Sequence, residues 1–222
     1  MNVLVVYAHH EPSSLTSAMK NLAVEVLSRQ NHAVVVSDLY GQGFNAPAQK
    51  WDFVTTTGEH FNYMLEQRHA TNLDLAFSPD ILGEIQKLRK AEIVIFVAPL
   101  WWMSVPAILK GWFDRVLAMG VAYDGGKIYE QGLMRGKQAM LVLAAGHPAE
   151  FFSAEGKHKA SPQQLLHPIN HGTLALCGFD VHEPYVALNV MGLNDNGKAQ
   201  VLADLQFRLD NLVNSPQWLV HY

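Results

Sequence analysis

The chain has 222 residues, of which 49% are hydrophobic and 16% charged, and its formal net charge is −4. This length allows one sizeable core, and a mildly acidic chain without a basic run is not expected to bind nucleic acid. No apolar window reaches the length of about 18 residues typical of a membrane helix, so stable membrane insertion is not expected. The single Cys177 excludes an internal disulfide, and a strand that begins at Asn2 leaves no room for a signal peptide. A cytoplasmic location is therefore expected.

The first predicted unit is a strand, a loop and a helix. Asn2 to Ala8 is a continuous apolar run, and apolar residues recur at helical spacing from Leu15 to Leu27. The loop between them, HHEPSSLT, crowds hydroxyl groups at the start of the helix, where free amides and the helix dipole favour phosphate. Ser14 and Thr16 could donate hydroxyl hydrogen bonds, and His9 an imidazole hydrogen bond. Ordinary N-capping by Ser13 or Ser14 is the alternative explanation.

A second strand at Ala33 to Asp38 is followed by a long excursion, at about 39–78, before the next helix, which begins near Ser78. Connections of this length are usually functional or ordered by a partner. Within the excursion, Phe61 to Tyr63 reads FNY, with aromatic and amide groups that could flank an adenine. A packed surface loop is the alternative.

The central stretch begins with Ile93 to Ala98, a fully apolar run typical of a strand covered on both faces. A helical stripe from Val105 to Leu117 follows, with Ser104 predicted as its N-cap and Pro106 in its first turn. The loop between them, PLWWMSV, then lies at the carboxyl end of the sheet, where open α/β sheets bind ligands. Two adjacent tryptophans there suit a flat aromatic ligand. Alternatively, they simply plug the sheet.

The remaining elements complete an alternating pattern. Lys137 to Gly146 predicts a fourth strand, Leu165 to Leu176 a helix, Cys177 to Leu188 a fifth strand, and Gln200 to Leu212 a closing helix. Continuous apolar strands alternating with helices indicate a doubly wound α/β domain with five parallel strands and helices on both faces.

The central motif P-L-x-W-x-x-x-P-A-I-L-K-G-W-F-D-R-V, followed by G-x-A-Y, resembles the flavodoxin-like NAD(P)H:quinone oxidoreductases of the DT-diaphorase type. The resemblance extends over nearly the whole chain and implies strand order 2-1-3-4-5 in a single domain, 1–222. It implies flavin contacts at His9, Ser14, Leu15, Thr16, Asn62, Tyr63, Pro99, Leu100, Trp101, Trp102, Met103, Ala144, Ala145, Gly146, His147 and Phe152. It implies substrate contacts at Trp102, Met103, Tyr123, Phe151 and His158.

This sequence also departs from the family pattern. Leu15 and Thr16 stand where other members have an aromatic residue and an asparagine, and Ala144 to His147 replaces Thr-Thr-Gly-Gly. Gly125 stands where some members have a second tyrosine, so a roomier pocket is expected. Some relatives bind a metal through two histidines one turn apart, but here His171 is followed by Ala175, so no metal is expected.

His158 matches a family histidine near the flavin carbonyl, but Phe152 replaces the accompanying tyrosine. Because phenylalanine cannot donate a hydrogen bond, we hypothesise that His158 alone is the catalytic donor, and that flavin reduction slows as this histidine loses its proton at rising pH. A solvated surface histidine is the alternative.

The function implied is transfer of hydride from NADH or NADPH to FAD, with FMN as runner-up, and of two electrons on to a quinone-like acceptor by ping-pong kinetics. A homodimer with composite active sites is also expected, because Ala107, Ala118 and Met119 widen the apolar surface of the central helix beyond one stripe. The alternatives are a regulatory subunit of a glutathione-gated potassium efflux system, an azo- or nitroreductase on the same flavin, and a one-electron flavodoxin carrier.

Overall fold

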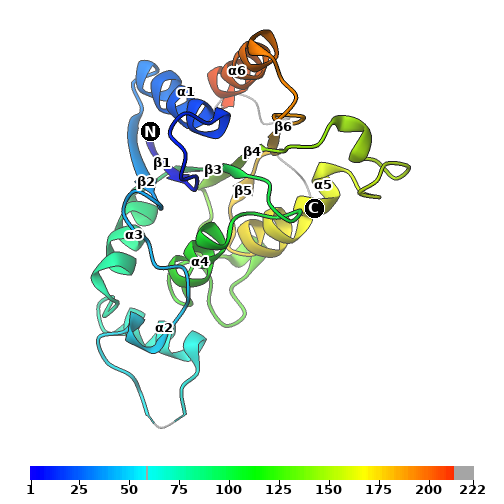
Figure 1. The fold of residues 1–222 in the computed structure, drawn as a ribbon. Helices are drawn as coiled ribbons and strands as arrows, with labels where there is room; N and C mark the ends of the chain where they lie inside the picture. Colours follow the sequence, from blue (N-terminus) through cyan, green and yellow to red (C-terminus); the bar gives the residue numbers. More distant parts are fainter. Residues whose placement is uncertain (59, 213–222) are drawn as a thin grey trace.

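The computed structural model describes residues 1–58 and 60–212, so the last ten residues of the predicted domain lie outside the described residues. Its centre is a parallel sheet in the order β2-β1-β3-β4-β5, which confirms the predicted order (Figure 1). The strands are β1 Asn2–Tyr7, β2 Ala33–Asp38, β3 Ile93–Pro99, β4 Gln138–Ala144, β5 Asp180–Val181 and β6 Tyr185–Ala187.

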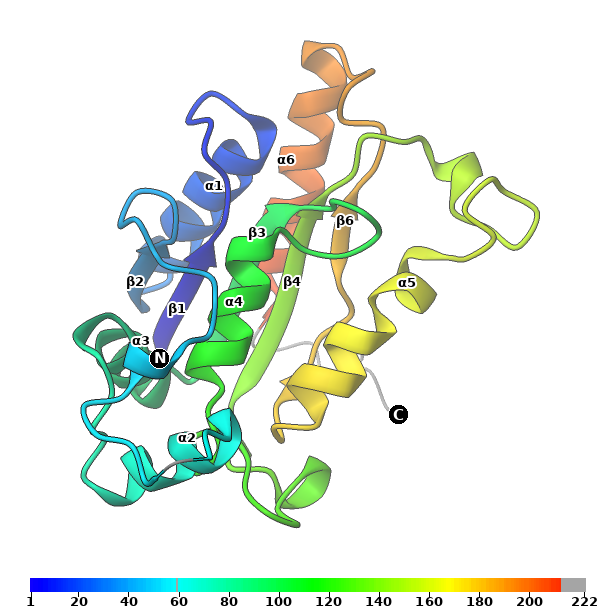
Figure 2. The same cartoon turned by 60° about the horizontal axis from the view of Figure 1, so that its bottom comes forward.

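Helices cover both faces of the sheet, as predicted (Figures 1 and 2). Successive residues of a strand point to opposite faces, so Val5 and Ile95 pack with α1 Leu15–Arg29 and α6 Asp195–Asp210. Leu4 and Phe96 face the other way, toward α3 Pro79–Lys90, α4 Ala107–Val116 and α5 Pro162–Ile169. Every residue of β3 is buried, as expected for the central strand. No helix of the described part of the chain is both long and apolar enough to span a bilayer.

The fifth strand differs from its prediction because it is split in two. β5 and β6 both pair with β4, but residues 182–184 between them belong to neither strand. Pro184 has no N–H to donate to a sheet, which accounts for an interruption at this point. The two short segments together fill the fifth position.

The helix predicted from Leu165 to Leu176 is also divided. α5 begins earlier, at Pro162, because Ser161 caps it and forms a capping box with Gln164. After Ile169 the chain continues as a π-helical turn, Asn170–Ala175. Pro168 lies just before this turn, and a proline inside a helix removes one backbone hydrogen bond and crowds the preceding turn.

The start of α4 corrects the predicted cap. Ser104 is not the N-cap: the helix begins at Ala107 with Pro106 before it, and no side chain caps it. The Ser104 backbone instead pairs with Trp101, each residue donating its N–H to the other's carbonyl at 3.0 Å. Pro106 also disfavours helical backbone at Val105, so the helix cannot begin earlier. The predicted buried stripe is otherwise present at Leu109, Trp112 and Val116.

The excursion packs against its own chain, in line with the alternative interpretation. It contains η1 Lys50–Asp52 and an unpredicted helix, α2 Tyr63–Asn72, which Asn62 caps. A bridge between Phe53 and Phe77 joins an inner segment of the excursion to its end. It also crosses α4, where a Cβ atom on Gly111 would lie 2.2 Å from the carbonyl oxygen of Ala46. Part of the second apolar side of α4, which predicted a partner, is therefore covered by the excursion.

Candidate flavin site

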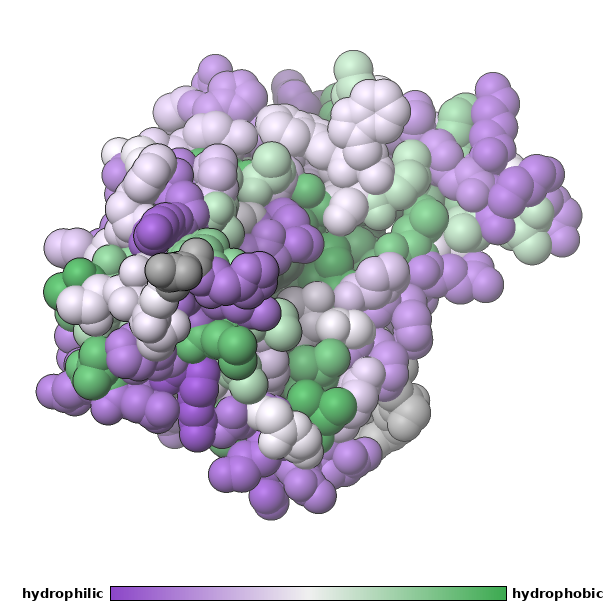
Figure 3. All heavy atoms as spheres, turned by 90° about the horizontal axis from the view of Figure 1, so that it is seen from below, coloured by the Kyte–Doolittle hydropathy of each residue, from purple (hydrophilic) through white to green (hydrophobic). Residues whose placement is uncertain are grey.

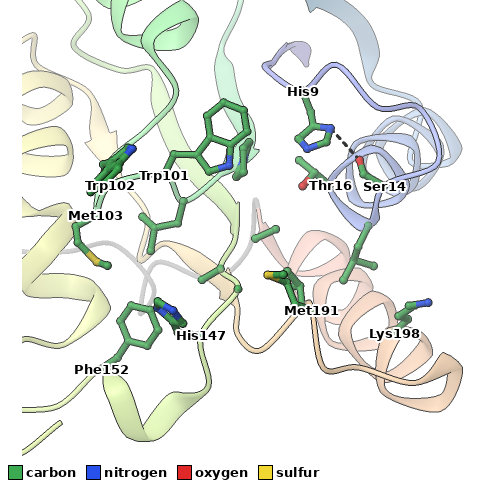
Figure 4. A pocket seen from close by; sticks show the side chains of 17 residues that line it. His9, Ser14, Thr16, Trp101, Trp102, Met103, His147, Phe152, Met191 and Lys198 are labelled. Carbon is green, nitrogen blue, oxygen red and sulfur yellow. Dashed lines mark hydrogen bonds between the residues drawn. The ribbon is translucent and has the colours of Figure 1, made fainter. Parts of the chain in front are cut away.

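A cavity of about 590 Å³ opens at the carboxyl ends of β1, β3 and β4 (Figure 4). It lies where the topology of an open parallel sheet predicts a ligand. Most of the predicted contacts line it, namely His9, Ser14, Leu15, Thr16, Pro99, Leu100, Trp101, Trp102, Met103, Ala144, Ala145, Gly146, His147 and Phe152. Their role as flavin contacts stays a prediction, but the fold brings them together.

One end of the cavity is the start of α1. Ser14 caps this helix by accepting a hydrogen bond from the Ser17 N–H at 3.1 Å, which confirms the capping alternative. Among the described residues, no group accepts from the N–H of Leu15 or Thr16, so both amides remain available at the positive end of the helix. This end of the cavity can therefore bind an anion while Ser14 caps the helix.

His9 lies beside this helix start, and its Nδ1 is 3.1 Å from the Ser14 hydroxyl. The same Nδ1 accepts the N–H of Glu11 at 3.0 Å. Burial is the main cause that lowers the pKa of His9. Since Nδ1 accepts, a neutral His9 carries its proton on Nε2, which can donate to a ligand.

The aromatic wall comes from the tight turn that follows β3. Trp102 and Met103 both have positive φ, 51° and 58°, and the two hydrogen bonds between Trp101 and Ser104 close the turn around them. Trp102 is 98% exposed and Trp101 39% exposed. An indole with this exposure does not plug the sheet, so that alternative is wrong for Trp102.

Small residues at the end of β4, the strand next to β3, form a second part of the cavity lining. Ala144 and Ala145 are buried, and a Cβ atom on Gly146 would approach the Met191 sulfur to 3.1 Å. Side chains here are short, so a planar ring can approach the backbone. Beyond Gly146, the imidazole of His147 and the ring of Phe152 border the cavity (Figure 4).

Sequence reasoning missed three lining residues, Val190, Met191 and Lys198, which follow β6. The available signal was their place after the fifth strand, at the same sheet edge as the other loops. Lys198 adds an ammonium group on the side of α6, and the group lies 3.4 Å from Asp195. Figure 4 shows Lys198 on the side of the cavity where Ser14 and Thr16 lie.

Five predicted contacts do not line this cavity. His158 and Phe151 lie behind His147: the His158 Nε2 is 2.9 Å from the His147 Nδ1, and the Phe151 ring centroid is 5.0 Å from that of His147. Asn62 lies at the start of α2, away from the cavity. Tyr63 and Tyr123 instead border a second hollow of about 450 Å³.

The second hollow lies between α2, α4 and the π-helical turn, and its lining includes Phe61, Phe113 and Cys177. Figure 3 looks at the side of the molecule where these elements lie and shows hydrophobic side chains in a depression near its middle. Burial raises the pKa of Tyr123, which therefore stays protonated and can donate a hydrogen bond.

The predicted absence of a metal is not tested by the structure. His171 stacks on His167 and on Tyr129, each with ring centroids 4.9 Å apart. Among residues 1–58 and 60–212, His, Cys, Asp and Glu form no group of three or more that could hold a metal ion.

Comparison with known proteins identifies the family. Residues 1–209 match the family model described as flavodoxin-like fold. The chain belongs to this family. It is 44% identical to human ribosyldihydronicotinamide dehydrogenase [quinone], over 83% of this chain and 80% of the relative. It is 38% identical to rat NAD(P)H dehydrogenase [quinone] 1, over 94% and 76%.

A solved structure gives the same result. A Klebsiella pneumoniae protein, provisionally assigned as a quinone reductase, superposes with a TM-score of 0.91 at 40% identity, covering 96% of this chain and 85% of that one. The resemblance to the NAD(P)H:quinone oxidoreductases, found first in the central motif, is therefore confirmed over most of the chain.

Proposed function

We propose that this flavodoxin-like chain is a flavoenzyme that takes hydride from a reduced nicotinamide and passes two electrons to a quinone. One observation carries the proposal: a single cavity joins a helix start with two free amides to an exposed indole wall. These are the two ends that a flavin nucleotide needs, a phosphate site and a surface on which a planar ring can stack. The quinone-reducing relatives support the same reaction class.

The residues present fit a flavin. The free amides of Leu15 and Thr16, the hydroxyl of Thr16 and the Lys198 ammonium suit the phosphates, and the short side chains from Ala144 to Gly146 leave room for the ring. Once bound, a flavin accepts and releases the hydride. The chain would hold the ring in this cavity and supplies proton donors at the cavity edge.

We propose FAD rather than FMN. The excursion supports this choice, because it presents Phe61 and Tyr63 as partly buried aromatic rings on one side of a hollow. Within one chain these rings lie outside the flavin cavity, so they would meet an adenine only from a second copy.

A homodimer with composite sites is consequently part of the proposal. Trp102 is almost fully exposed at the mouth of the cavity, while Tyr123 faces a separate hollow of the same chain. A second copy would bring Tyr123 and Tyr63 of one chain over the indole wall of the other. Sedimentation tests the arrangement: we expect a dimer at micromolar concentration, and a fully active monomer would contradict it.

The proposed hydride donor is NADH or NADPH. The names of relatives from four mammals instead give ribosyldihydronicotinamide as the compound that is oxidised. A donor panel with NADH, NADPH and dihydronicotinamide riboside distinguishes them. The acceptor panel should pair a benzoquinone with an azo dye and a nitroaromatic compound. Faster turnover of the azo dye would replace quinone reduction with the azoreductase alternative. A cytoplasmic location stays a prediction.

The decisive experiment is spectroscopic. The purified protein should show flavin absorption, and chromatography of the released cofactor should give FAD. Anaerobic addition of the nicotinamide should bleach the flavin, and quinone should then restore it in a separate mixing step. A protein that binds no flavin after reconstitution would overturn the proposal, whereas release of FMN alone would overturn only the choice of FAD.

A further inference from the structure

Two histidines at the edge of the flavin cavity form a directly bonded pair. The Nδ1 of His147 lies 2.9 Å from the Nε2 of His158, and the ring centroids are 4.9 Å apart. His147 lines the cavity, whereas His158 does not and is reached from the cavity through its hydrogen bond to His147. Among the described residues, nothing hydrogen-bonds the other ring nitrogen of His147, Nε2.

The surrounding loop holds the pair in place without competing for its protons. Phe151 packs on His147 with centroids 5.0 Å apart, and Phe152 packs on His158 at 4.7 Å. The His158 N–H donates to the Phe151 carbonyl at 2.9 Å, which closes the loop. Gly156 permits this closure, because a Cβ atom there would lie 2.4 Å from the Glu150 carbonyl oxygen. Phenylalanine side chains cannot donate or accept, so the two imidazoles bond to each other.

The proposed function requires a proton in every turnover. Reduction of a quinone to a hydroquinone consumes one hydride and one proton, so NAD(P)H, a proton and quinone become NAD(P)⁺ and hydroquinone. The hydride comes from the nicotinamide, whereas the proton must come from water through the protein. Histidine is the side chain best suited to this transfer near neutral pH.

We propose that His147 is the proton donor inside the cavity. His158 is the positioning residue, which passes a proton to His147 when His147 has given up its own. This inference rests on the proposed function and assigns the donor role to a pair instead of to His158 alone. At the start the pair carries one positive charge, with protons on both nitrogens of His158 and on the Nε2 of His147. The His147 Nδ1 accepts the proton between the rings.

The transfer balances. His147 releases its Nε2 proton to the oxygen of the acceptor, and the proton on the His158 Nε2 crosses to the His147 Nδ1. Both rings are then neutral, and the hydrogen bond between them is kept with its direction reversed. Water returns one proton to the exposed His147 Nε2, the shared proton moves back to His158, and the positive charge is restored.

The charged groups near the pair are few and of both signs. The Lys157 ammonium lies 4.7 Å from the centroid of the Phe151 ring. Glu150, Glu155 and Lys159 belong to the same loop and are exposed. The other titratable groups that line the cavity are His9 and Lys198. No carboxylate hydrogen-bonds either imidazole within the described part of the chain, so the shared bond is between nitrogens only.

The test uses the FAD-reconstituted enzyme with His147→Gln and His158→Gln, and with His32→Gln as the control. His32 bonds the chain N-terminus, at the opposite end of the sheet. Glutamine keeps a polar group but cannot relay a proton. We expect each of the first two variants to slow quinone reduction by about 10²-fold and to remove its dependence on pH, while His32→Gln leaves both unchanged.

A second readout does not depend on turnover. With ¹⁵N-labelled imidazoles, the Nδ1 of His147 and the Nε2 of His158 should respond to the same protonation step in the wild type, and His158→Gln should abolish the shared response of His147. Independent responses would overturn the relay, as would unchanged quinone reduction in His147→Gln. Failure of the proposed function would be recognised separately, as a protein that binds no flavin.

Discussion

Arg115 donates two parallel hydrogen bonds to Asp52, from Nε to Oδ2 at 3.0 Å and from Nη2 to Oδ1 at 2.8 Å, and both side chains are buried. The remaining nitrogen of Arg115 donates to the Asn45 carbonyl and to Asp80, and the Tyr63 hydroxyl donates to Asp52 at 2.7 Å. One guanidinium on α4 therefore anchors the excursion at several points.

Removal of this guanidinium should destabilise the protein strongly. We expect Arg115→Met to lower the free energy of unfolding by about 3–5 kcal/mol, because the Asp52 carboxylate is left buried and unpaired. Urea denaturation measures the change. Arg29→Met is the matched control, since its pair with Asp210 is long, at 3.7 Å, and exposed, and should cost less than about 1 kcal/mol. Equal losses in the two variants would contradict the account.

Two glycines in helices should respond to alanine in opposite ways. Gly111 lies against the Ala46 backbone, so Gly111→Ala must push the excursion off α4 and should cost at least about 1–3 kcal/mol. Gly83 in α3 has open space around its Cβ position, so Gly83→Ala should stabilise the protein by about 0.5–1 kcal/mol through helix propensity. Melting temperatures of the two variants test the pair, and a stabilised Gly111→Ala variant would refute the close approach.

Trp102 should affect the KM for quinone and not the stability of the protein. Because its side chain is 98% exposed, Trp102→Ala should leave the stability within about 0.5 kcal/mol of the wild type. The loss of a stacking wall should raise the KM for quinone by about tenfold, which corresponds to about 1.4 kcal/mol. Trp51→Ala is the control, since Trp51 is also exposed but lies in η1. An unchanged KM in Trp102→Ala would remove the indole from the site.

Steady-state kinetics should be ping-pong. The proposed cavity has one exposed indole wall, so nicotinamide and quinone would stack in turn at the same place. Double-reciprocal plots at several fixed quinone concentrations should be parallel. Intersecting lines would instead indicate that both substrates are bound at once, at separate positions.

His182 should make stability depend on pH. Its side chain is buried beside Gln138, and burial lowers its pKa to about 4. The folded protein therefore holds the neutral form, whereas the unfolded chain takes up a proton near pH 6.5, the ordinary histidine value. The contribution of His182 to the free energy of unfolding is complete above pH 6.5 and is lost progressively as the pH falls to 4. The total loss is about 1.4 kcal/mol for each pH unit that separates the two pKa values. His182→Gln should flatten thermal stability over this window, and an unchanged pH profile would show that another group is responsible.

The sequence predicted most of the fold because its strands are continuous apolar runs, such as Ile93 to Ala98, and its helices carry clear stripes. It predicted most of the cavity because the loops after β1, β3 and β4 meet at one edge of the sheet. The missed features depend on contacts between distant segments. α2 could not be inferred from local pattern alone, because Arg115 and Asp52 hold its surroundings together across 63 positions in the chain.

The histidine at the cavity edge shows the same limit. The family resemblance pointed to His158, but the loop geometry places His147 between His158 and the cavity. Ser104 was predicted as a helix cap because serine commonly caps helices, yet its backbone was already engaged with Trp101. In both cases the local sequence does not show the contact that decides where the residue lies or what it does.

The turn from Trp101 to Ser104 has a consequence for the affinity of the cavity for its ligand. Its two reciprocal hydrogen bonds and its pair of left-handed residues fix the backbone before any ligand arrives. Ordering a loop during association commonly weakens binding, and here that ordering has already occurred during folding. A planar molecule therefore meets a rigid receptor, and the turn should superpose closely between ligand-free and loaded crystals, with equally low atomic displacement in both.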